Sequence, residues 1–271
     1  MPRTIEDIYP SKGDSDFHQI ITGERIDRLA PFVLFDAVTV KTDSQWGFGW
    51  HAHSGVATLT YLYAATLNHE DTASGAGVIE AGGFQWMQAG GGIWHKEMLD
   101  AIDGFVGAHQ LWVQLPPAFE EGENCYFDVA KGDLPKSGNT KILIGQYGDG
   151  DAGKTVPVDM TYLDVALDAG EIWHFDAPNT QKRGFVFPRQ GDLMVEGVAV
   201  TEGSMGVFVD ADDAIVISAT SPAKFVIALT ALPDFPMVKA YGQIHTTEEA
   251  LQRSTDRIKA LEASVPGRAF S

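Results

Sequence analysis

The sequence is poor in cysteine and contains no long apolar run. Cys125 is the single cysteine among 271 residues, so an intrachain disulfide is excluded and a reducing compartment is expected. No segment approaches the ~20 consecutive apolar residues of a membrane-spanning helix, and the opening MPRTIEDIYPSKG lacks the apolar core of a signal peptide. These absences predict a cytoplasmic protein that does not enter a membrane.

Basic residues are also scarce. The chain has 19 lysines and arginines against 37 aspartates and glutamates, which gives a formal net charge of -18 at pH 7. A charge of this sign repels phosphate backbones, so direct binding of nucleic acid is not expected. With 44% hydrophobic and 21% charged residues, the composition is that of a globular protein and argues against disorder.

Short runs of β-forming residues dominate the chain, and glycine, proline, asparagine or aspartate separates nearly all of them. Many such runs at short spacing predict an all-β sandwich or barrel. The expected strands are Pro31–Thr39, Thr58–Tyr63, Gly77–Glu80, Phe84–Gln88, Ile93–Met98, Gln110–Leu115, Ile142–Tyr147, Tyr162–Leu167, Glu171–Phe175, Gly184–Phe187, Asp192–Val200, Met205–Val209, Ala214–Ser218 and Lys224–Thr230.

A short helix is predicted near the carboxyl end, over residues 247–262. Thr246 followed three residues later by Glu249 forms a capping-box pattern. An apolar stripe at helical spacing follows it, made of Leu251, Ile258 and Leu261. Upstream, the polar segment AKGDLPKSGNT (residues 130–140) separates two β-rich halves. We therefore expect an N-terminal domain over residues 1–135 and a C-terminal domain over 136–271 that includes the helix.

Two histidines stand one residue apart in the stretch GWHAHSGVATLTY. In a strand, alternate side chains share a face, so His51 and His53 project side by side. His69 is interpreted as a loop histidine. His95 and Glu97 have the same spacing as His51 and His53, so they also share a face of their strand. If the two strands are neighbours, three imidazoles and one carboxylate meet, and this donor set suits iron, manganese, copper, nickel or zinc. Four protein ligands leave open positions on an octahedral metal, as metal catalysis needs.

The alternation beyond His53 predicts which residues face that metal. Continued without a break, it places Gly55, Ala57, Leu59 and Tyr61 on the histidine face, with small residues nearest the metal. A turn or bulge at Ser54–Gly55 would reverse this count.

The sequence around these residues resembles that of the pirin family, a branch of the cupins. Pirins carry a block close to HPHRGFETVTYL, and this chain has HAHSGVATLTYL over residues 51–62. The phrases GVI, QWM, AG, GI and a histidine followed two residues later by glutamate then appear in the family's order. They stand here as Gly77-Val78-Ile79, Gln85-Trp86-Met87, Ala89-Gly90, Gly92-Ile93 and His95-Lys96-Glu97, with Pro31-Phe32 and Gln110-Leu111-Trp112-Val113 as further matches.

The resemblance implies a bicupin, in which two cupin-type β-barrels stand in tandem and the first alone binds metal, typically iron. By the family pattern the metal ligands are His51, His53, His95 and Glu97, and the C-terminal barrel lacks metal ligands. The family arginine and phenylalanine are replaced by Ser54 and Val56, which predicts a different pocket mouth.

The resemblance also implies two functions. One is a dioxygenase like quercetin 2,3-dioxygenase, which would take a small aromatic flavonol and dioxygen, with Glu97 as the base. The other is a regulator without enzymatic activity, which would bind a protein partner and use the metal as a structural or redox-sensitive element.

Overall fold

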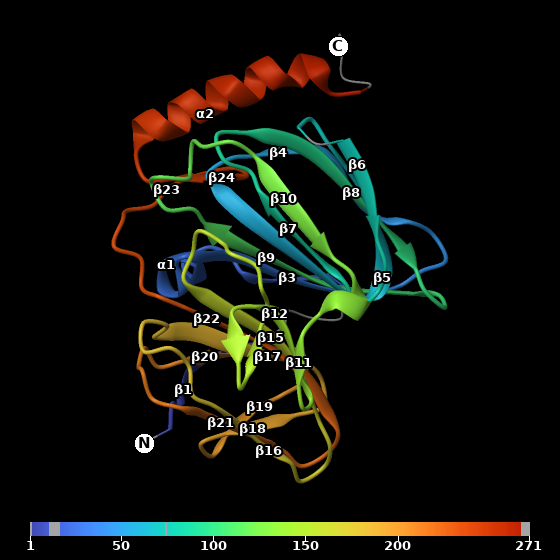
Figure 1. Cartoon of the computed structure of the whole chain (residues 1–271), viewed down its shortest axis with the longest axis vertical. Helices are drawn as coiled ribbons and strands as arrows, with labels where there is room; N and C mark the ends of the chain where they lie inside the picture. Colours follow the sequence, from blue (N-terminus) through green and yellow to red (C-terminus); the bar gives the residue numbers. More distant parts are fainter. Residues whose placement is uncertain (1, 11–16, 74, 267–271) are drawn as a thin grey trace. The chain divides into compact units, whose positions relative to one another are not determined.

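The computed structural model describes residues 2–10, 17–73 and 75–266. Strands make up most of its regular structure (Figure 1). The chain divides into two compact units. The first unit comprises Ser15–Asp133 and Pro233–Ser271, and the second comprises Met1–Asp14 and Leu134–Leu232. No helix in the described ranges is long and apolar enough to cross a membrane.

This division differs from the predicted one at residue 135. The first residues of the chain group with the C-terminal half, and the last residues group with the N-terminal half. The predicted C-terminal domain contained the helix, whereas the structure groups the helix with the strands before Asp133. The reason is non-local packing. Trp94 donates a hydrogen bond from Nε1 to the carbonyl of Ile258 on the helix at 2.9 Å, and the two side chains share one apolar cluster. Spacing along the sequence does not reveal such a pairing.

The first unit is built from antiparallel strands. Its elements are β2 (Phe17–Ile21), α1 (Arg25–Leu29), β3 (Phe32–Lys41), β4 (Trp46–His53), β5 (Val56–Asp71), β6 (Gly75–Ile79), β7 (Phe84–Gln88), β8 (Ile93–Ala101), β9 (Phe105–Gln114), β10 (Cys125–Val129), β23 (Val238–Ala240), β24 (Gln243–His245) and α2 (Glu248–Leu261), with 3₁₀ turns at Lys131–Asp133 and Glu262–Ser264.

The long strand β5 joins the two layers of this unit. Its first part pairs with β7 and β9, in a sheet of order β10-β7-β5-β9-β3-β2. Its last part pairs with β6 and β8, and β8 pairs with β4. Because one strand belongs to both layers, the sheet curls round an interior into which side chains of β3, β4, β5, β8 and β9 can point.

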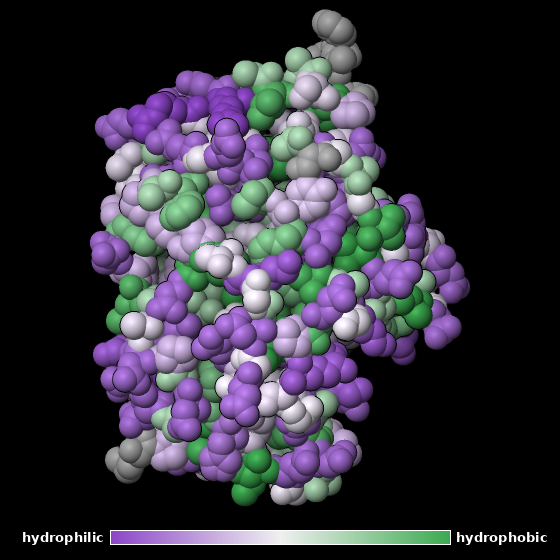
Figure 2. Space-filling view, viewed as in Figure 1, coloured by the Kyte–Doolittle hydropathy of each residue, from purple (hydrophilic) through white to green (hydrophobic). Residues whose placement is uncertain are grey.

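The helix α2 begins one residue later than the capping-box pattern predicted. Thr247 is the N-cap residue, and its side chain accepts a hydrogen bond from the Ala250 amide at 3.1 Å. The buried face of α2 carries Ala250, Ser254 and Ile258. Figure 2 shows hydrophilic residues gathered over the amino-terminal half of this helix, as expected for its opposite face.

The second unit packs two sheets on one apolar core. The larger sheet has the order β1-β20-β17-β22-β15-β12-β11, and the smaller has the order β16-β21-β18-β19. Their strands are β1 (Ile5–Tyr9), β11 (Lys136–Ser137), β12 (Thr140–Ile144), β15 (Met160–Leu167), β16 (Ile172–Phe175), β17 (Arg183–Gln190), β18 (Leu193–Val195), β19 (Val198–Val200), β20 (Met205–Phe208), β21 (Ile215–Ala219) and β22 (Ala223–Thr230), and the short pair β13 (Gln146–Tyr147) and β14 (Gly150–Asp151) lies beside them in sequence.

Candidate metal centre

Three histidines of the first unit converge inside it. Strands β4 and β8 pair antiparallel with His51 directly opposite His95, and His53 follows on the same face of β4. The ring centroids are 4.7 Å apart for His51 and His53, 4.3 Å for His51 and His95, and 5.0 Å for His53 and His95. Each ring offers one nitrogen, and these three atoms all lie within 4.8 Å of one another. The three imidazoles expected to share a face therefore do meet, and their assignment as metal ligands stays a prediction.

Backbone carbonyls orient two of these rings. His51 Nδ1 lies 2.7 Å from the carbonyl oxygen of Gly49, and His53 Nδ1 lies 3.1 Å from that of Gly242. A carbonyl only accepts, so in both rings Nδ1 carries the proton and Nε2 keeps its lone pair. Nε2 of His95 is buried and has no hydrogen-bond partner. Three lone pairs without donors are what a bound cation requires, so the residues present fit a divalent transition metal.

The carbonyl that holds His53 comes from the turn between β23 and β24. Gly242 has φ of 70°, a conformation that favours glycine. A Cβ at this position would stand 2.7 Å from the carbonyl oxygen of Ala52 and 3.2 Å from Nδ1 of His53. The close approach of this turn to the histidine therefore needs a glycine, and it makes the C-terminal segment part of the centre.

Burial keeps two of the imidazoles neutral. Burial, together with the neighbouring His51, lowers the pKa of His53 to about 3. Burial and the neighbouring histidines also lower the pKa of His95 well below the ordinary histidine value of 6.5. At neutral pH both rings are therefore uncharged, with one nitrogen protonated and the other free to bind metal.

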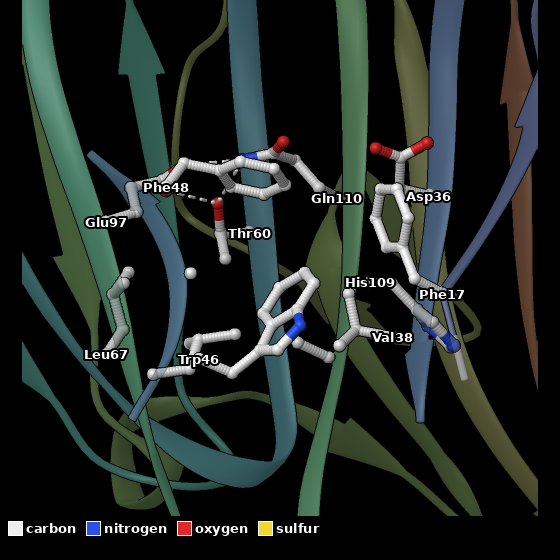
Figure 3. A pocket seen from close by; sticks show the side chains of 13 residues that line it. Phe17, Asp36, Val38, Trp46, Phe48, Thr60, Leu67, Glu97, His109 and Gln110 are labelled. Carbon is white, nitrogen blue, oxygen red and sulfur yellow. Dashed lines mark hydrogen bonds between the residues drawn. The ribbon is translucent and has the colours of Figure 1, made fainter. Parts of the chain in front are cut away.

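Glu97 lies beside the histidines but outside their group. Its side chain is 4% exposed. Its carboxylate accepts hydrogen bonds from Thr60 Oγ1 at 3.0 Å and from Gln110 Nε2 at 2.7 Å, which Figure 3 draws as dashed lines. The two bonds go to different carboxylate oxygens and fix the plane of the group, while each oxygen keeps a further lone pair. The structure thus orients Glu97, and its assignment as fourth metal ligand stays a prediction.

His69 is not a loop residue. It lies in β5 directly opposite Glu97, is 5% exposed, and has Nε2 3.5 Å from the Asp128 carboxylate. The predicted strand Thr58–Tyr63 was too short, because the polar residues Asn68-His69-Glu70-Asp71 resemble a loop although they continue the strand.

A cavity of about 330 Å³ adjoins the histidines. His51, His53 and Trp112 line it, and the Trp112 ring centroid lies 4.4 Å from that of His53. The remaining wall is mainly apolar and aromatic, with a few polar groups. It is formed by Gln19, Ile21, Thr22, Ile26, Val33, Leu34, Asp36, Phe48, Ala52, Gln110 and residues 239–244. A cavity of this size and character suits a small flat ligand.

The residues that follow His53 were predicted to lie on the wrong face of their strand. β4 ends at His53 and β5 begins at Val56, and between them Gly55 adopts φ of 69°. This turn reverses the count, so Thr58 and Thr60 share the interior with the histidines in place of Ala57 and Leu59. Thr60 hydrogen-bonds Glu97, and Thr58 lies directly opposite Trp112.

The substituted family positions do not form the pocket mouth. Ser54 and Val56 are both 0% exposed. Ser54 Oγ donates to Gln243 Oε1 at 3.0 Å and lies 2.9 Å from His245 Nε2. Ser54 therefore has a structural role, because these contacts attach the C-terminal segment to the end of β4.

Glu120 continues this attachment from a buried position. It is 4% exposed and accepts hydrogen bonds from both the amide and the hydroxyl of Thr246 at 2.6 Å. Its carboxylate also lies 3.4 Å from Nδ1 of His245. The segment that supplies Gly242 to the metal centre is therefore held by buried polar contacts on both sides.

A row of polar residues across the sheet escaped the sequence analysis. Gln19 faces Asp36, Asp36 faces Gln110, Gln110 faces Thr60, and Thr60 faces Gln85 in direct cross-strand register. We call these five residues the polar belt. One signal was available, since Asp36 is the single charged residue in the apolar run FVLFDAVTV (residues 32–40).

Comparison with known proteins gives three findings. The pirin family model matches residues 14–113. A pirin-like protein of Caulobacter vibrioides is 30% identical over 237 residues, which cover 83% of this chain and 84% of that protein. Among solved structures, a quercetin 2,3-dioxygenase of Acinetobacter baumannii aligns over 100% of both chains with a TM-score of 0.87 at 20% identity. The pirin YhhW of Escherichia coli in complex with nickel(II) aligns over 84% of this chain and 100% of its own, with a TM-score of 0.65 at 19% identity.

These findings settle the fold class and the family. The structural matches confirm the all-β architecture of two tandem cupin-type barrels with a C-terminal helix. The Caulobacter relative covers most of both sequences, and the matched family segment contains all three converging histidines. The chain belongs to the pirin family.

Proposed function

We propose that the protein is a metal-dependent dioxygenase that opens the ring of a flavonol or a related enolic aromatic. The observation that carries the proposal is the group of three histidines, two of which, His51 and His53, line a cavity large enough for a small aromatic ligand. The name of the structurally similar Acinetobacter protein, a quercetin 2,3-dioxygenase, supports the same reaction class.

His51, His53 and His95 would hold the metal through Nε2, and Glu97 is the proposed fourth ligand. Bound there, a divalent transition metal supplies Lewis acidity toward an enolic oxygen and open positions for exchangeable ligands. Iron is our proposal for the native metal. Manganese, copper, nickel and zinc share the preference for these donors, and the related YhhW structure contains nickel.

Glu97 is the proposed base. Thr60 and Gln110 fix its carboxylate, which would take the proton of the substrate's enolic hydroxyl. Trp112 and Phe48 line the cavity and would hold the aromatic rings away from water. In the overall reaction both atoms of dioxygen enter the product, and one ring carbon leaves as carbon monoxide.

The test is stoichiometric turnover. Protein loaded separately with iron(II), manganese(II), nickel(II), copper(II) or zinc(II) is given quercetin in air, and oxygen uptake, carbon monoxide release and flavonol loss are measured together. We expect a 1:1:1 ratio with at least one metal. Absence of oxygen uptake with every metal and with a panel of flavonols and catechols would refute the dioxygenase.

A second measurement separates the two proposed roles of Glu97. If Glu97 acts only as a base, Glu97→Gln lowers turnover by about 10²-fold or more with unchanged metal content. As a ligand, the same variant loses metal as well. Glu70→Gln is the matched control, because Glu70 forms a surface ion pair with Lys96 at 2.6 Å outside the centre. The alternative function, a metal-dependent regulator that binds another protein, predicts full metal content without turnover.

A further inference from the structure

Asp36 occupies an unusual place in the cavity wall. It lies on β3 and is 3% exposed, yet it lines the same cavity as His51 and His53. It also lines the smaller pocket that contains Glu97, where Figure 3 shows it on the far side of Gln110 from Glu97. A buried acidic side chain therefore stands within reach of any ligand that extends from the histidines across the polar belt.

The Asp36 carboxyl group is only partly satisfied. Gln19 forms a hydrogen bond with the side chain, whereas Oδ1 is buried and has no hydrogen-bond partner. Lys239 is the single lysine of the cavity wall, and its ammonium group is already paired with Asp27 at 2.6 Å. A buried carboxyl oxygen without a partner is costly, and at the edge of a cavity it points to a ligand that supplies a donor.

Trp112 is the second unsatisfied group of this cavity wall. Its Nε1 is buried without a hydrogen-bond partner, and indole Nε1–H can only donate. Among the described residues that line the cavity, Asp36 Oδ1 and Trp112 Nε1 are the two buried side-chain polar atoms left unpaired. Because Trp112 contacts His53, an acceptor next to the metal-binding oxygen would satisfy it. The ligand should therefore offer an acceptor near the metal and a donor farther away.

We propose that Asp36 determines specificity by hydrogen-bonding a ring hydroxyl of the substrate other than the one that binds the metal. The inference rests on the proposed function for the class of ligand. It adds that the preferred substrates are aromatics with a hydroxyl–carbonyl pair for the metal and Trp112, and a further hydroxyl for Asp36. The direct register between Asp36 and Gln110 places this second contact beside the residue that orients Glu97.

Ligand binding under anaerobic conditions tests the proposal without turnover. The probes are quercetin and 3-hydroxyflavone, which share the hydroxyl–carbonyl pair, although only quercetin has further ring hydroxyls. The measurement is made at pH 8, where the Asp36 carboxyl is ionised. A hydrogen bond to a charged group contributes about 1.5–3 kcal/mol, so the wild type should bind quercetin about 10- to 100-fold more tightly than 3-hydroxyflavone. Asp36→Leu should abolish this preference and leave the affinity for 3-hydroxyflavone unchanged. Asp100→Leu is the control, because that carboxylate bonds Gln45 and Asn68 outside the cavity.

An infrared measurement covers the case in which Asp36→Leu fails to fold. The carboxyl band of Asp36, assigned by difference from the near-isosteric Asp36→Asn, should shift when quercetin binds and not when 3-hydroxyflavone binds. An unchanged band, or a preference for quercetin that survives in Asp36→Leu, overturns the role of Asp36 alone. If neither flavonoid binds the wild type and none is turned over, the proposed function fails as well.

Discussion

The two units build their interiors in opposite ways. In the second unit, one apolar cluster runs across both sheets and includes Leu163, Phe225 and Ile217. In the first unit, the polar belt separates an apolar cluster that contains Leu62 and Ala108 from another that contains Val56 and Met87. The second interior is organised for stability, whereas the first interior gives up a continuous core to hold polar and ionisable groups.

This difference shows which kind of barrel interior can hold a functional site. Burial of an ionisable group is unfavourable without a partner, so a unit that buries His95, Glu97 and Asp36 must satisfy each of them. Glu97 has two donors, and His51 and His53 each have a backbone carbonyl as acceptor. Of these residues, His95 and Asp36 each keep one buried atom without a hydrogen-bond partner, Nε2 and Oδ1, and these atoms stand where a metal and a ligand would complete them.

The largest expected effect is loss of metal from the first unit. His95→Ala removes one of three converging imidazoles, so we expect metal affinity to fall by at least a hundredfold, since even loss of a group that only supports a ligand costs 10- to 100-fold. Elemental analysis of purified, metal-loaded protein measures this. His174→Ala, an exposed position on β16 of the second unit, is the control and should keep the full metal content. Equal metal content in both variants would show that the metal centre is not in the first unit.

The second expected effect is a stability loss confined to the other interior. Phe225 is 0% exposed and its ring meets Trp173 edge-on at a centroid distance of 5.8 Å. Phe225→Ala should lower the free energy of unfolding of the second unit by about 3–5 kcal/mol through the lost contacts and the cavity left behind. Urea unfolding measures the loss, and metal content at low urea should match the wild type. A variant that loses metal while still folded would mean that the two interiors are not independent in function.

The three histidines could be found from the sequence because the evidence for them is local. The spacing of His51 and His53, and that of His95 with Glu97, sets a common face on each strand whatever the rest of the chain does. The prediction failed at Gly55, where a single turn with positive φ inverts every later position. Spacing alone carries no information about backbone conformation at such a point.

The polar belt and the C-terminal attachment could not be found because they depend on register between distant strands. Asp36 and Gln110 become neighbours only when β3 and β9 pair, and Gly242 reaches His53 only when the C-terminal segment returns to the first unit. Likewise, Glu120 looks like a surface acid until Thr246 is placed against it. Residues that depend on one strand were predictable, and residues that depend on tertiary pairing were not.

The third expected effect is a gain in stability from removing a belt carboxyl. Burial raises the pKa of Asp36 to about 7 from an unfolded value of 3.8. The folded protein therefore holds a proton that the unfolded chain releases, so the stability contributed by the neutral acid is complete below pH 3.8 and is lost as pH rises to about 7. Asp36→Asn stays neutral, and it should be more stable than the wild type at pH 8 by up to about 4 kcal/mol.

Urea unfolding of both proteins at pH 5 and pH 8 measures this difference, which should shrink toward the lower pH. The comparison between the units predicts this sign, because a group retained for ligand binding lowers the stability of its unit. A variant less stable than the wild type at pH 8 would show instead that the Asp36 carboxylate stabilises the first unit.

The smallest expected effect concerns the helix that covers the first unit. Thr247 caps α2 through its bond to the Ala250 amide, so Thr247→Ala should lower the free energy of unfolding by about 1 kcal/mol. Thr246→Ala is the informative partner, because the sequence pattern placed the cap there. It removes the hydroxyl bonded to buried Glu120 and leaves that carboxylate under-satisfied, so its loss should exceed that of Thr247→Ala. Circular dichroism with urea titration ranks the two variants. The reverse order would leave Thr247 as the cap and show that the Thr246 hydroxyl adds little to the contacts of Glu120 that hold the segment of Gly242 at the metal centre.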